Sequence, residues 1–280
     1  MNLNKCSIDK DITMIVNSCN DYGDVVPLFL AALKEYWPSW DGDIIINNEK
    51  YLEVNHLTDL KRREVTWGKR LQLILQSIQT NYVLMVFDDY ILESKVNVSK
   101  FNEFMEILAK DENQSVFYLN AVCLRDHSDD KVSNFRILKD KVDFRINSAP
   151  AVWRKNDLQS YVGEKDNPWA WEVFGTYRSF GDGKVFCSPS SVENNLFNYN
   201  YKKGGAIYRG KWVREVVVDK CEKYGIDIDF NKRGFTDDLA NEKRTWLWKV
   251  KFIWLGFRMV GFKSLYYFIG YVRAKAKGNA

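Results

Sequence analysis

The chain carries YVLMVFDDY at residues 82–90, an apolar run that ends abruptly in two aspartates. Six apolar residues bounded by polar ones are typical of a strand buried in a parallel sheet. Adjacent carboxylates repel each other unless a cation offsets their charge, and Mg²⁺ or Mn²⁺ commonly binds one or two carboxylates together with substrate phosphates. Asp88 and Asp89 therefore predict a divalent-cation site at this strand end. The alternative is that one aspartate caps a turn while the other is solvated.

Two similar runs precede this strand, ITMIVNSCND from residue 12 and DIIINN from residue 43. Apolar positions at helical spacing over residues 24–36 and 66–78 predict helices between the strands. Strand, helix and strand in this order begin an α/β fold with a parallel sheet, whose ligands bind at the carboxyl ends of the strands. The polar residues after each run lie at those ends.

The middle of the chain is less regular. We predict a helix over residues 102–109, a strand over 116–124 and a hairpin within 125–147. Residues 149–153 are expected to lead into a capped helix at Asn156 or Asp157, and a further helix begins at Pro168, which suits a first helical turn. A length of 280 residues with 46% hydrophobic content predicts one domain with an appendage.

Composition excludes several classes of site and compartment. Five cysteines without a CxxC pair indicate reduced thiols, and two histidines make a zinc site improbable, so a metal here should be oxygen-ligated. The N-terminus has no apolar run of signal-peptide length. We therefore predict a cytoplasmic protein.

The C-terminal tail differs in charge from the rest of the chain. Residues 243–280 contain nine basic and no acidic residues, and removing these nine charges from the net +4 leaves −5 for residues 1–242. Arg244, Lys251 and Arg258 are seven residues apart and so share one face of a helix. The roughly opposite face carries Trp248, Phe252, Leu255 and Met259. Basic residues interrupt each apolar run before it reaches the roughly 20 residues of a membrane span. We predict amphipathic helices that lie on an anionic membrane surface, with nucleic acid excluded as a partner. The alternative is a C-terminal helix packed on the body.

The order of ITMIVNSCND, DIIINN and WGKRLQLILQSIQTNYVLMVFDDY resembles the nucleotide-sugar domain of type A glycosyltransferases over roughly residues 11–215. More narrowly, it is similar to bacterial transferases that build capsule or O-antigen polysaccharide. The resemblance implies a Rossmann-like, GT-A-like α/β fold with a mixed, mostly parallel sheet and helices on both faces. We expect the catalytic domain over residues 1–242, with the basic aromatic tail over 243–280 holding it on the inner face of the plasma membrane.

The same resemblance implies binding roles by position. Asp89 would bind Mn²⁺ or Mg²⁺, with Asp88 as a second ligand or a contact to the sugar or ribose. The remaining residues would hold the nucleotide of a donor, expected to be a UDP-sugar: Ser18, Asn20, Asp21, Tyr22 and Asn47 at the nucleoside, and Lys69, Arg70, Arg209 and Lys211 at the diphosphate. Each cation could equally be part of a solvated surface.

Glu172, in NPWAWEVFG, is the candidate base of an inverting transfer to a glycan or lipid-linked acceptor, with Asp166 as the substitute. Trp153 is expected to line the acceptor cleft. Glutamate in a first helical turn is also favourable for the helix dipole alone.

Two other functions fit parts of the pattern. A nucleotidyltransferase or a phosphatase would also handle phosphate on an α/β sheet, although NSCNDYG lacks the glycine-rich cationic loop expected of a nucleotidyltransferase. A non-enzymatic membrane adaptor would use the carboxylates only structurally.

Overall fold

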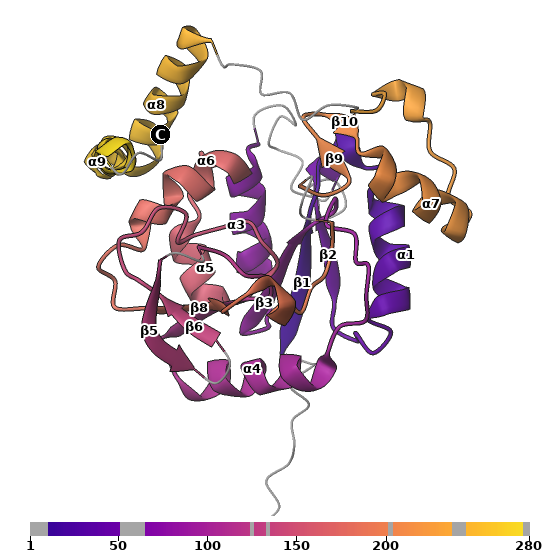
Figure 1. The fold of residues 1–280 in the computed structure, drawn as a ribbon, viewed down its shortest axis with the longest axis horizontal. Helices are drawn as coiled ribbons and strands as arrows, with labels where there is room; N and C mark the ends of the chain where they lie inside the picture. The colour runs from indigo at the N-terminus through magenta and orange to yellow at the C-terminus, as the bar shows by residue number, and fades with distance from the viewer. Residues whose placement is uncertain are drawn as a thin grey trace, which may run out of the picture.

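The computed structural model describes residues 11–50, 65–123, 126–132, 135–200, 204–236 and 245–276. Arg244 and the expected domain boundary at residues 242 and 243 lie outside these ranges. Within them, one sheet holds eight strands and helices cover it on two sides (Figure 1).

The strands and helices alternate along the first half of the chain. In sheet order the strands are β2 (Ile44–Asn47), β1 (Ile12–Asn17), β3 (Tyr82–Phe87), β7 (Ala151–Arg154), β4 (Gln114–Tyr118), β8 (Val185–Pro189), β6 (Phe135–Leu138) and β5 (His127–Val132). The helices are α1 (Val26–Tyr36), α3 (Trp67–Ser77), α4 (Val98–Lys110), α5 (Lys155–Tyr161), α6 (Pro168–Val173), α7 (Arg214–Tyr224), α8 (Trp246–Val260) and α9 (Leu265–Ala276). Short 3-10 turns include η2 (Asn20–Tyr22), η4 (Gly175–Arg178) and η8 (Gly261–Ser264), and a separate two-stranded ribbon joins β9 (Ile207–Tyr208) to β10 (Lys211–Trp212).

The sheet is mixed, but it is not mostly parallel as expected. Parallel pairing holds for β1 with β2, β1 with β3, and β4 with β8. Strand β7 lies antiparallel between β3 and β4, and the hairpin of β5 and β6 extends the sheet in antiparallel register beyond β8. An apolar run in the sequence indicates a buried strand but not whether that strand runs parallel to its neighbours, so the expectation of a mostly parallel sheet was wrong.

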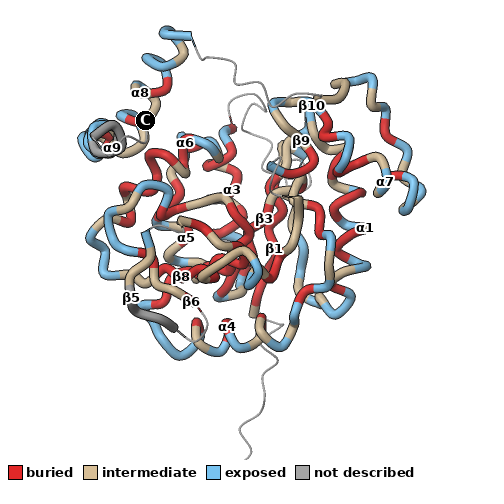
Figure 2. Tube along the Cα trace, viewed as in Figure 1, coloured by how far each residue is buried: buried red, intermediate tan, exposed pale blue. Residues whose placement is uncertain are grey.

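Both faces of the sheet are buried, as expected. On β1, Met14 and Val16 belong to a cluster beneath α1, α4 and α7, while Ile15 belongs to a second cluster beneath α3, α5 and α6. Alternate side chains of a strand point to opposite faces, so one apolar run supplies both cores. In Figure 2 the central strands β1, β3 and β4 are correspondingly buried along nearly all of their length.

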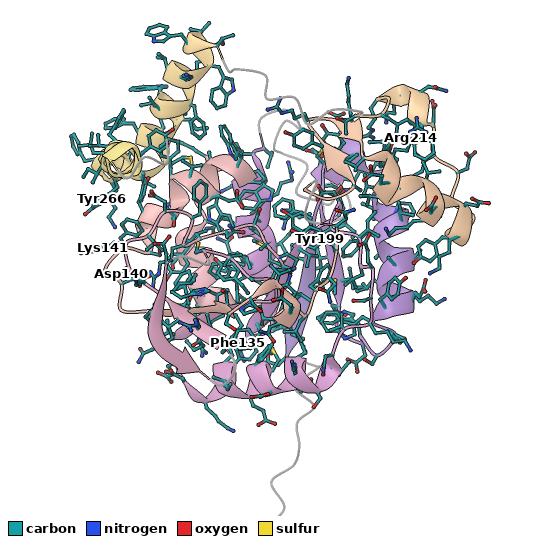
Figure 3. The ribbon with its side chains drawn as sticks, viewed as in Figure 1. Phe135, Asp140, Lys141, Tyr199, Arg214 and Tyr266 are labelled. Atoms are coloured by element: carbon teal, nitrogen blue, oxygen red, sulfur yellow. The ribbon has the colours of Figure 1, made fainter. Side chains whose placement is uncertain are left out.

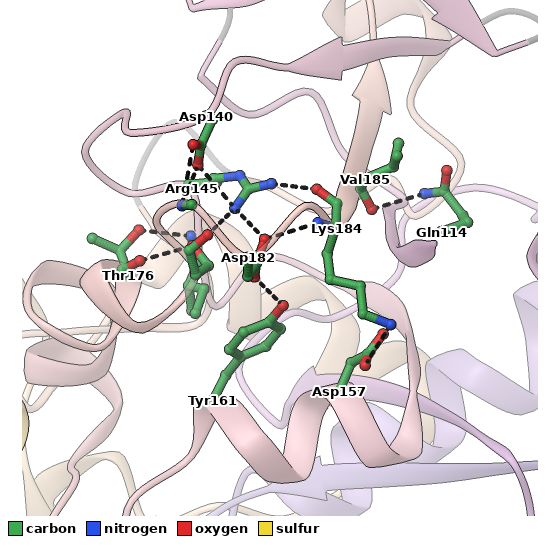
Figure 4. A network of polar contacts seen from close by, with 12 residues as sticks. Gln114, Asp140, Arg145, Asp157, Tyr161, Thr176, Asp182, Lys184 and Val185 are labelled. Carbon is green, nitrogen blue, oxygen red and sulfur yellow. Dashed lines mark hydrogen bonds and ion pairs between the residues drawn. The ribbon is translucent and has the colours of Figure 1, made fainter. Parts of the chain in front are cut away.

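The predicted hairpin within 125–147 forms earlier than the apolar spacing suggested, between β5 and β6. Residues 139–147 form a loop instead of a strand, with positive φ at Lys141 and Phe144. A buried arginine fixes that loop: Arg145 donates to the carbonyl oxygens of Ser179 and Lys184, and its guanidinium lies 4.0 Å from the centre of the Phe186 ring. Figure 4 shows this network, in which Asp140 and Asp182 supply the opposing charges.

The helices of the tail pack against the body. Phe252 of α8 stacks on Trp169 of α6 with ring centres 4.1 Å apart, and Tyr266 of α9 (Figure 3) contacts Tyr177 of η4. Gly256 permits the close approach, because a Cβ atom there would lie 2.5 Å from the ring of Phe174. No helix in the described ranges is long and apolar enough to cross a membrane.

Candidate functional site

A cavity of about 340 Å³ opens at the carboxyl ends of β1 and β3. Such a volume lies at the lower end of the range for small-molecule sites. Its walls combine apolar rings with a few polar groups, and the lining residues are Asn17, Ser18, Cys19, Tyr22, Trp67, Arg70, Phe87, Asp88, Asp89, Pro168 and Ile207. Ligands of open α/β sheets bind at this edge. The predicted residues Ser18, Tyr22, Arg70, Asp88 and Asp89 are thus brought together.

Asn17 organises the floor of the cavity. Its Nδ2 donates to the carbonyl of Val86 at 2.9 Å, which joins β1 to β3. Its Oδ1 accepts from Asn47 Nδ2 at 2.9 Å and from the indole nitrogen of Trp67 at 2.7 Å. Asn47 is fully buried, so its side chain serves this network and does not line the cavity.

Arg70 is held firmly at the cavity wall. Its Nη1 lies 3.0 Å from Glu49 Oε1, and its Nε donates to Asn47 Oδ1 at 3.3 Å. Glu49 Oε2 also accepts from the backbone nitrogen of Asn20 at 2.7 Å, so it ties η2 to α3. Burial lowers the pKa of Arg70, and the charge of Glu49 opposes that shift. Arg70 therefore offers a fixed but partly neutralised positive charge.

Among the described residues that line the cavity, Asp88 carries a buried polar atom that the fold leaves unsatisfied. Its side chain is buried, and among the described residues its Oδ2 has no hydrogen-bond partner. Burial raises its pKa to about 7, although a hydrogen bond from the Ser18 side chain lowers it in part. A buried carboxylate oxygen without a partner is costly, and such atoms in a cavity commonly face a ligand or an ion.

Asp89 lies beside it and is half-buried. Burial raises the pKa of Asp89 well above its ordinary value, and the charge of Asp88 raises it further. Its backbone oxygen accepts from the nitrogen of Ala206 at 2.8 Å, so the segment before β9 packs directly on it. Gly205 is required there, because its φ is +109° and a Cβ atom would lie 2.7 Å from the Asp89 carbonyl oxygen.

These two carboxylates fit a hard divalent cation. Both offer oxygen ligands, one of them an unpartnered buried atom, and a cation would offset their mutual repulsion. The described residues hold no cluster of three or more protein metal ligands. A cation bound here would therefore take its remaining ligands from substrate phosphate and water.

The turn between β9 and β10 borders the same cavity. Ile207 lines it, while Arg209 and Lys211 are exposed on the turn. A Cβ atom at Gly210 would lie 3.3 Å from the Tyr22 hydroxyl, which places the turn against Tyr22. The guanidinium of Arg233 lies 4.7 Å from the centre of the Tyr22 ring, so one side of this ring already carries a cation.

Six predicted binding residues do not line the cavity, namely Asn20, Asp21, Asn47, Lys69, Arg209 and Lys211. Asn20 and Asp21 are exposed on η2. Lys69 pairs with Glu164 at the surface, 2.5 Å from its Oε1. Their assignment to the nucleotide stays a prediction.

Glu172 lies on α6, one turn after Pro168, and residues at this spacing share a helix face. Pro168 lines the cavity, so Glu172 lies on the face of α6 that is turned toward the cavity, next to Pro168. Glu172 Oε1 accepts from the backbone nitrogen of Ser148 at 2.7 Å and from its hydroxyl. Burial raises the pKa of Glu172, and the Ser148 hydrogen bonds oppose that shift.

Two stacked tyrosines connect Glu172 with the aspartates. The ring of Tyr199, which is labelled in Figure 3, lies 4.4 Å from the ring of Tyr90, and the hydroxyls of Tyr90 and Ser148 are 3.3 Å apart. Burial raises the pKa of both tyrosines, and the charges of Asp89 and Glu172 add to each shift. The carboxylates of Asp89 and Glu172 are therefore both close enough to this tyrosine pair to affect its pKa values.

Asp166 and Trp153 both lie in the interior of the protein, and the role of Asp166 as the substitute base stays a prediction. Asp166 is buried, and its two oxygens pair with the guanidinium of Arg178, whose Nη2 lies 2.9 Å from Oδ1. Trp153 is fully buried in the core against Trp171 and Phe186, so the expectation that it lines a cleft was wrong.

Sequence reasoning missed about half of the lining residues. Asn17 could have been found, because it ends an apolar strand as Asp88 does. Trp67, Phe87 and Pro168 carry no polar signal and cannot be distinguished from core residues by pattern. Ile207 belongs to a late two-residue strand that no periodicity predicts.

No protein-family model and no curated protein matches the chain. Similar solved structures include residues 1–349 of TarS from S. aureus, with a TM-score of 0.42 and 12% identity over 65% of this chain and 58% of that one. Another TarS structure has a TM-score of 0.44 at 12% identity, over 65% and 35% of the two chains. The bifunctional IspDF from Campylobacter jejuni has a TM-score of 0.37 at 12% identity, over 66% and 51%. The chain thus spans less than two thirds of each of these structures, and at these TM-scores none assigns an activity to it.

Proposed function

We propose that the chain is a glycosyltransferase that moves a sugar from a nucleoside-diphosphate sugar to an acceptor hydroxyl. The expected donor is a UDP-sugar, and the expected acceptor is a glycan or a lipid-linked oligosaccharide of bacterial surface-polysaccharide synthesis. The observation that carries the proposal is the unpartnered Oδ2 of Asp88, beside Asp89, in a cavity at the carboxyl end of β3.

The composition of the cavity favours a nucleotide over a simple phosphate ester. Trp67, Phe87 and Tyr22 provide ring surface on which a base or a sugar can pack. Two carboxylates in the wall would repel a diphosphate, so an anionic ligand enters this cavity only together with a cation. Asp88 and Asp89 would hold Mn²⁺ or Mg²⁺, which would supply positive charge to the leaving nucleoside diphosphate.

The residues of the chain then have separable roles. Arg70 supports the diphosphate side of the cavity, although Glu49 balances much of its charge. Glu172 takes the proton from the attacking acceptor hydroxyl, because its raised pKa brings it closer to that of an effective base at neutral pH. Ser148 orients its carboxylate. Attack from the α6 side, opposite the leaving diphosphate, would invert the anomeric centre.

A thermal-shift panel tests this function. We expect a UDP-sugar with Mn²⁺ to raise the melting temperature by about 5 °C, since ligand at a hundredfold excess over its Kd stabilises by about 2.7 kcal/mol. Inorganic pyrophosphate with Mn²⁺ should have a much smaller effect, because it leaves the ring surfaces uncovered. Equal shifts from pyrophosphate and from all nucleotide sugars would contradict the proposal, as would hydrolysis of a generic phosphate ester with no sugar transfer.

A further inference from the structure

Helix α8 has two apolar faces, and the body covers only one of them. Phe252 and Gly256 are buried, and Trp248 stacks on Phe252 with ring centres 5.1 Å apart. This docked face packs on Trp169 and Phe174 of the α6 region. Figure 1 shows α8 and α9 lying outside α6, away from α1 and α7.

The opposite face of α8 carries an exposed aromatic stripe. Trp254 is 60% exposed and Phe257 is 40% exposed, and their rings stack 5.8 Å apart. The stripe continues into η8, because Phe257 also contacts Phe262, which is 80% exposed. We define the exposed stripe as Trp246, Val250, Trp254, Phe257 and Phe262. Isolated exposed apolar residues are ordinary on protein surfaces, but a contiguous aromatic row marks an interaction surface.

Cations border this stripe on both sides. At helical spacing Lys251 and Arg258 lie along one edge and Lys249 along the other, and all three are exposed. Lys263 follows Phe262 directly and is also exposed. The chain has no acidic residue from Lys243 to its end, so the tail contributes no carboxylate of its own to neutralise this surface.

The apolar face of α8 that is exposed is not the one that the sequence pattern suggested for lipid contact. Trp248, Phe252, Leu255 and Met259 were expected to contact lipid, but Phe252 is buried against the body and the other three pack on the same cluster. The apolar surface of α8 that the body leaves uncovered is the exposed stripe, which is richer in aromatic residues than the docked face.

We propose that the exposed stripe is a docking surface for an anionic lipid bilayer, with its rings at the headgroup boundary and Lys249, Lys251 and Arg258 against lipid phosphates. Tryptophan and phenylalanine next to lysine and arginine are typical of helices that lie in a membrane interface. Each cation near an anionic leaflet contributes about 1 kcal/mol of attraction. A second copy of the chain fits less well, because two stripes facing each other would bring two uncompensated basic tails together.

This proposal does not depend on the proposed transfer reaction. Its consequence is geometric, since the docked face of α8 packs on Trp169 and Phe174, which flank Glu172 in sequence. A tail bound to a bilayer would therefore hold the α6 side of the site near the lipid surface.

Vesicle sedimentation with the full chain tests the docking surface. We expect the protein to bind vesicles of phosphatidylcholine with phosphatidylglycerol, and to bind phosphatidylcholine alone at least about tenfold more weakly. The triple change Trp254→Ser, Phe257→Ser and Phe262→Ser should reduce binding to the anionic vesicles by about tenfold or more. These side chains are exposed, so the circular dichroism spectrum and melting temperature should remain those of the unchanged chain.

Matched controls distinguish binding by the exposed stripe from nonspecific hydrophobic adsorption and from an effect of net charge. Leu30→Ser with Ile44→Ser removes exposed apolar side chains of the body and should leave binding unchanged. The change Lys249→Gln, Lys251→Gln and Arg258→Gln should weaken binding about tenfold or more. Lys34→Gln, Lys95→Gln and Lys139→Gln removes the same charge from the body and should have little effect.

Results of two kinds, from the vesicle assay and from the oligomeric state, would overturn the proposal. One is equal binding to neutral and anionic vesicles, or binding that the stripe variant retains. The other is a dimer in lipid-free solution that the stripe variant converts to a monomer, because the stripe would then be an interface between two copies.

Discussion

Glu172 and Ser148 form a fixed pair, in which the backbone nitrogen of Ser148 donates to Glu172 Oε1 at 2.7 Å and the Ser148 hydroxyl donates to the same oxygen. The pair joins α6 to the segment before β7, so the carboxylate is positioned by two elements that are distant in sequence. Hydrogen bonds to a carboxylate favour its charged form, while burial favours the neutral form. Both effects act on Glu172, with burial the larger.

The change Glu172→Gln should reduce kcat by about 10²- to 10⁴-fold, the usual contribution of a positioned base. The affinity for the donor nucleotide should remain unchanged, because Glu172 does not line the cavity. Steady-state transfer assays together with nucleotide titrations measure both quantities. Ser148→Ala is the companion variant: it should lower kcat less and shift the acidic limb of the pH profile upward, since a lost hydrogen bond raises the pKa of Glu172 further. Normal turnover by Glu172→Gln would remove it as the base.

Gly205→Ala should weaken cation-dependent nucleotide binding without unfolding the chain. The new Cβ would lie 2.7 Å from the carbonyl oxygen and 3.0 Å from Oδ2 of Asp89, so Asp89 must shift. Gly204→Ala is a matched control, because Gly204 also has a positive φ but meets nothing within 4 Å. Calorimetric titration of UDP with Mn²⁺ should show a loss for Gly205→Ala only. Equal losses in both variants would show that backbone strain alone is responsible.

The change Asp88→Asn should stabilise the ligand-free protein more at pH 8 than at pH 5. The folded-state pKa of Asp88 is raised to about 7, so the folded state holds a proton that the unfolded state has already lost above its ordinary value. The wild-type chain consequently loses stability as the pH rises toward 7, by about 1.4 kcal/mol for each unit. Asparagine removes this loss. Urea unfolding across pH 5–8 measures it, and a variant whose stability follows the wild-type pH profile would contradict the assignment.

Asp166→Asn should destabilise the fold by about 3–5 kcal/mol, because it leaves the guanidinium of Arg178 without its buried partner. Glu164→Gln breaks the exposed pair with Lys69 and should cost less than about 1 kcal/mol. Urea unfolding of the two variants gives the comparison. If Asp166→Asn instead kept its stability and lost turnover, Asp166 would belong to the reaction.

The sequence predicts those parts of the fold in which the apolar pattern of a segment matches its burial in the folded protein. The strand predicted over residues 82–87 matches β3, and the one predicted over residues 12–16 ends one residue before β1 does. Both runs are largely apolar, and such a run can supply both cores only as a central strand. Residues 119–124 were expected to continue β4, but the strand ends at Tyr118, where the chain turns to meet the segment before β7.

The cavity was predictable only in part, for a physical reason. Asp88 and Asp89 are visible because adjacent carboxylates after a buried strand require an explanation. Asn47 and Arg70 look equally like ligand-binding residues, yet their partners Asn17 and Glu49 come from other segments. A single sequence does not show that such polar groups are already satisfied by the protein.

The central claim is that Asp88 and Asp89 hold a divalent cation that joins a nucleoside diphosphate to this cavity. Isothermal titration of UDP into the wild-type chain and Asp89→Asn, each with Mn²⁺ and with EDTA, tests it most directly. The account predicts that Mn²⁺ strengthens UDP binding by the wild type at least about tenfold, or 1.4 kcal/mol, and that Asp89→Asn loses this gain while remaining folded. Equal affinity with Mn²⁺ and with EDTA, or a full gain in Asp89→Asn, would contradict it.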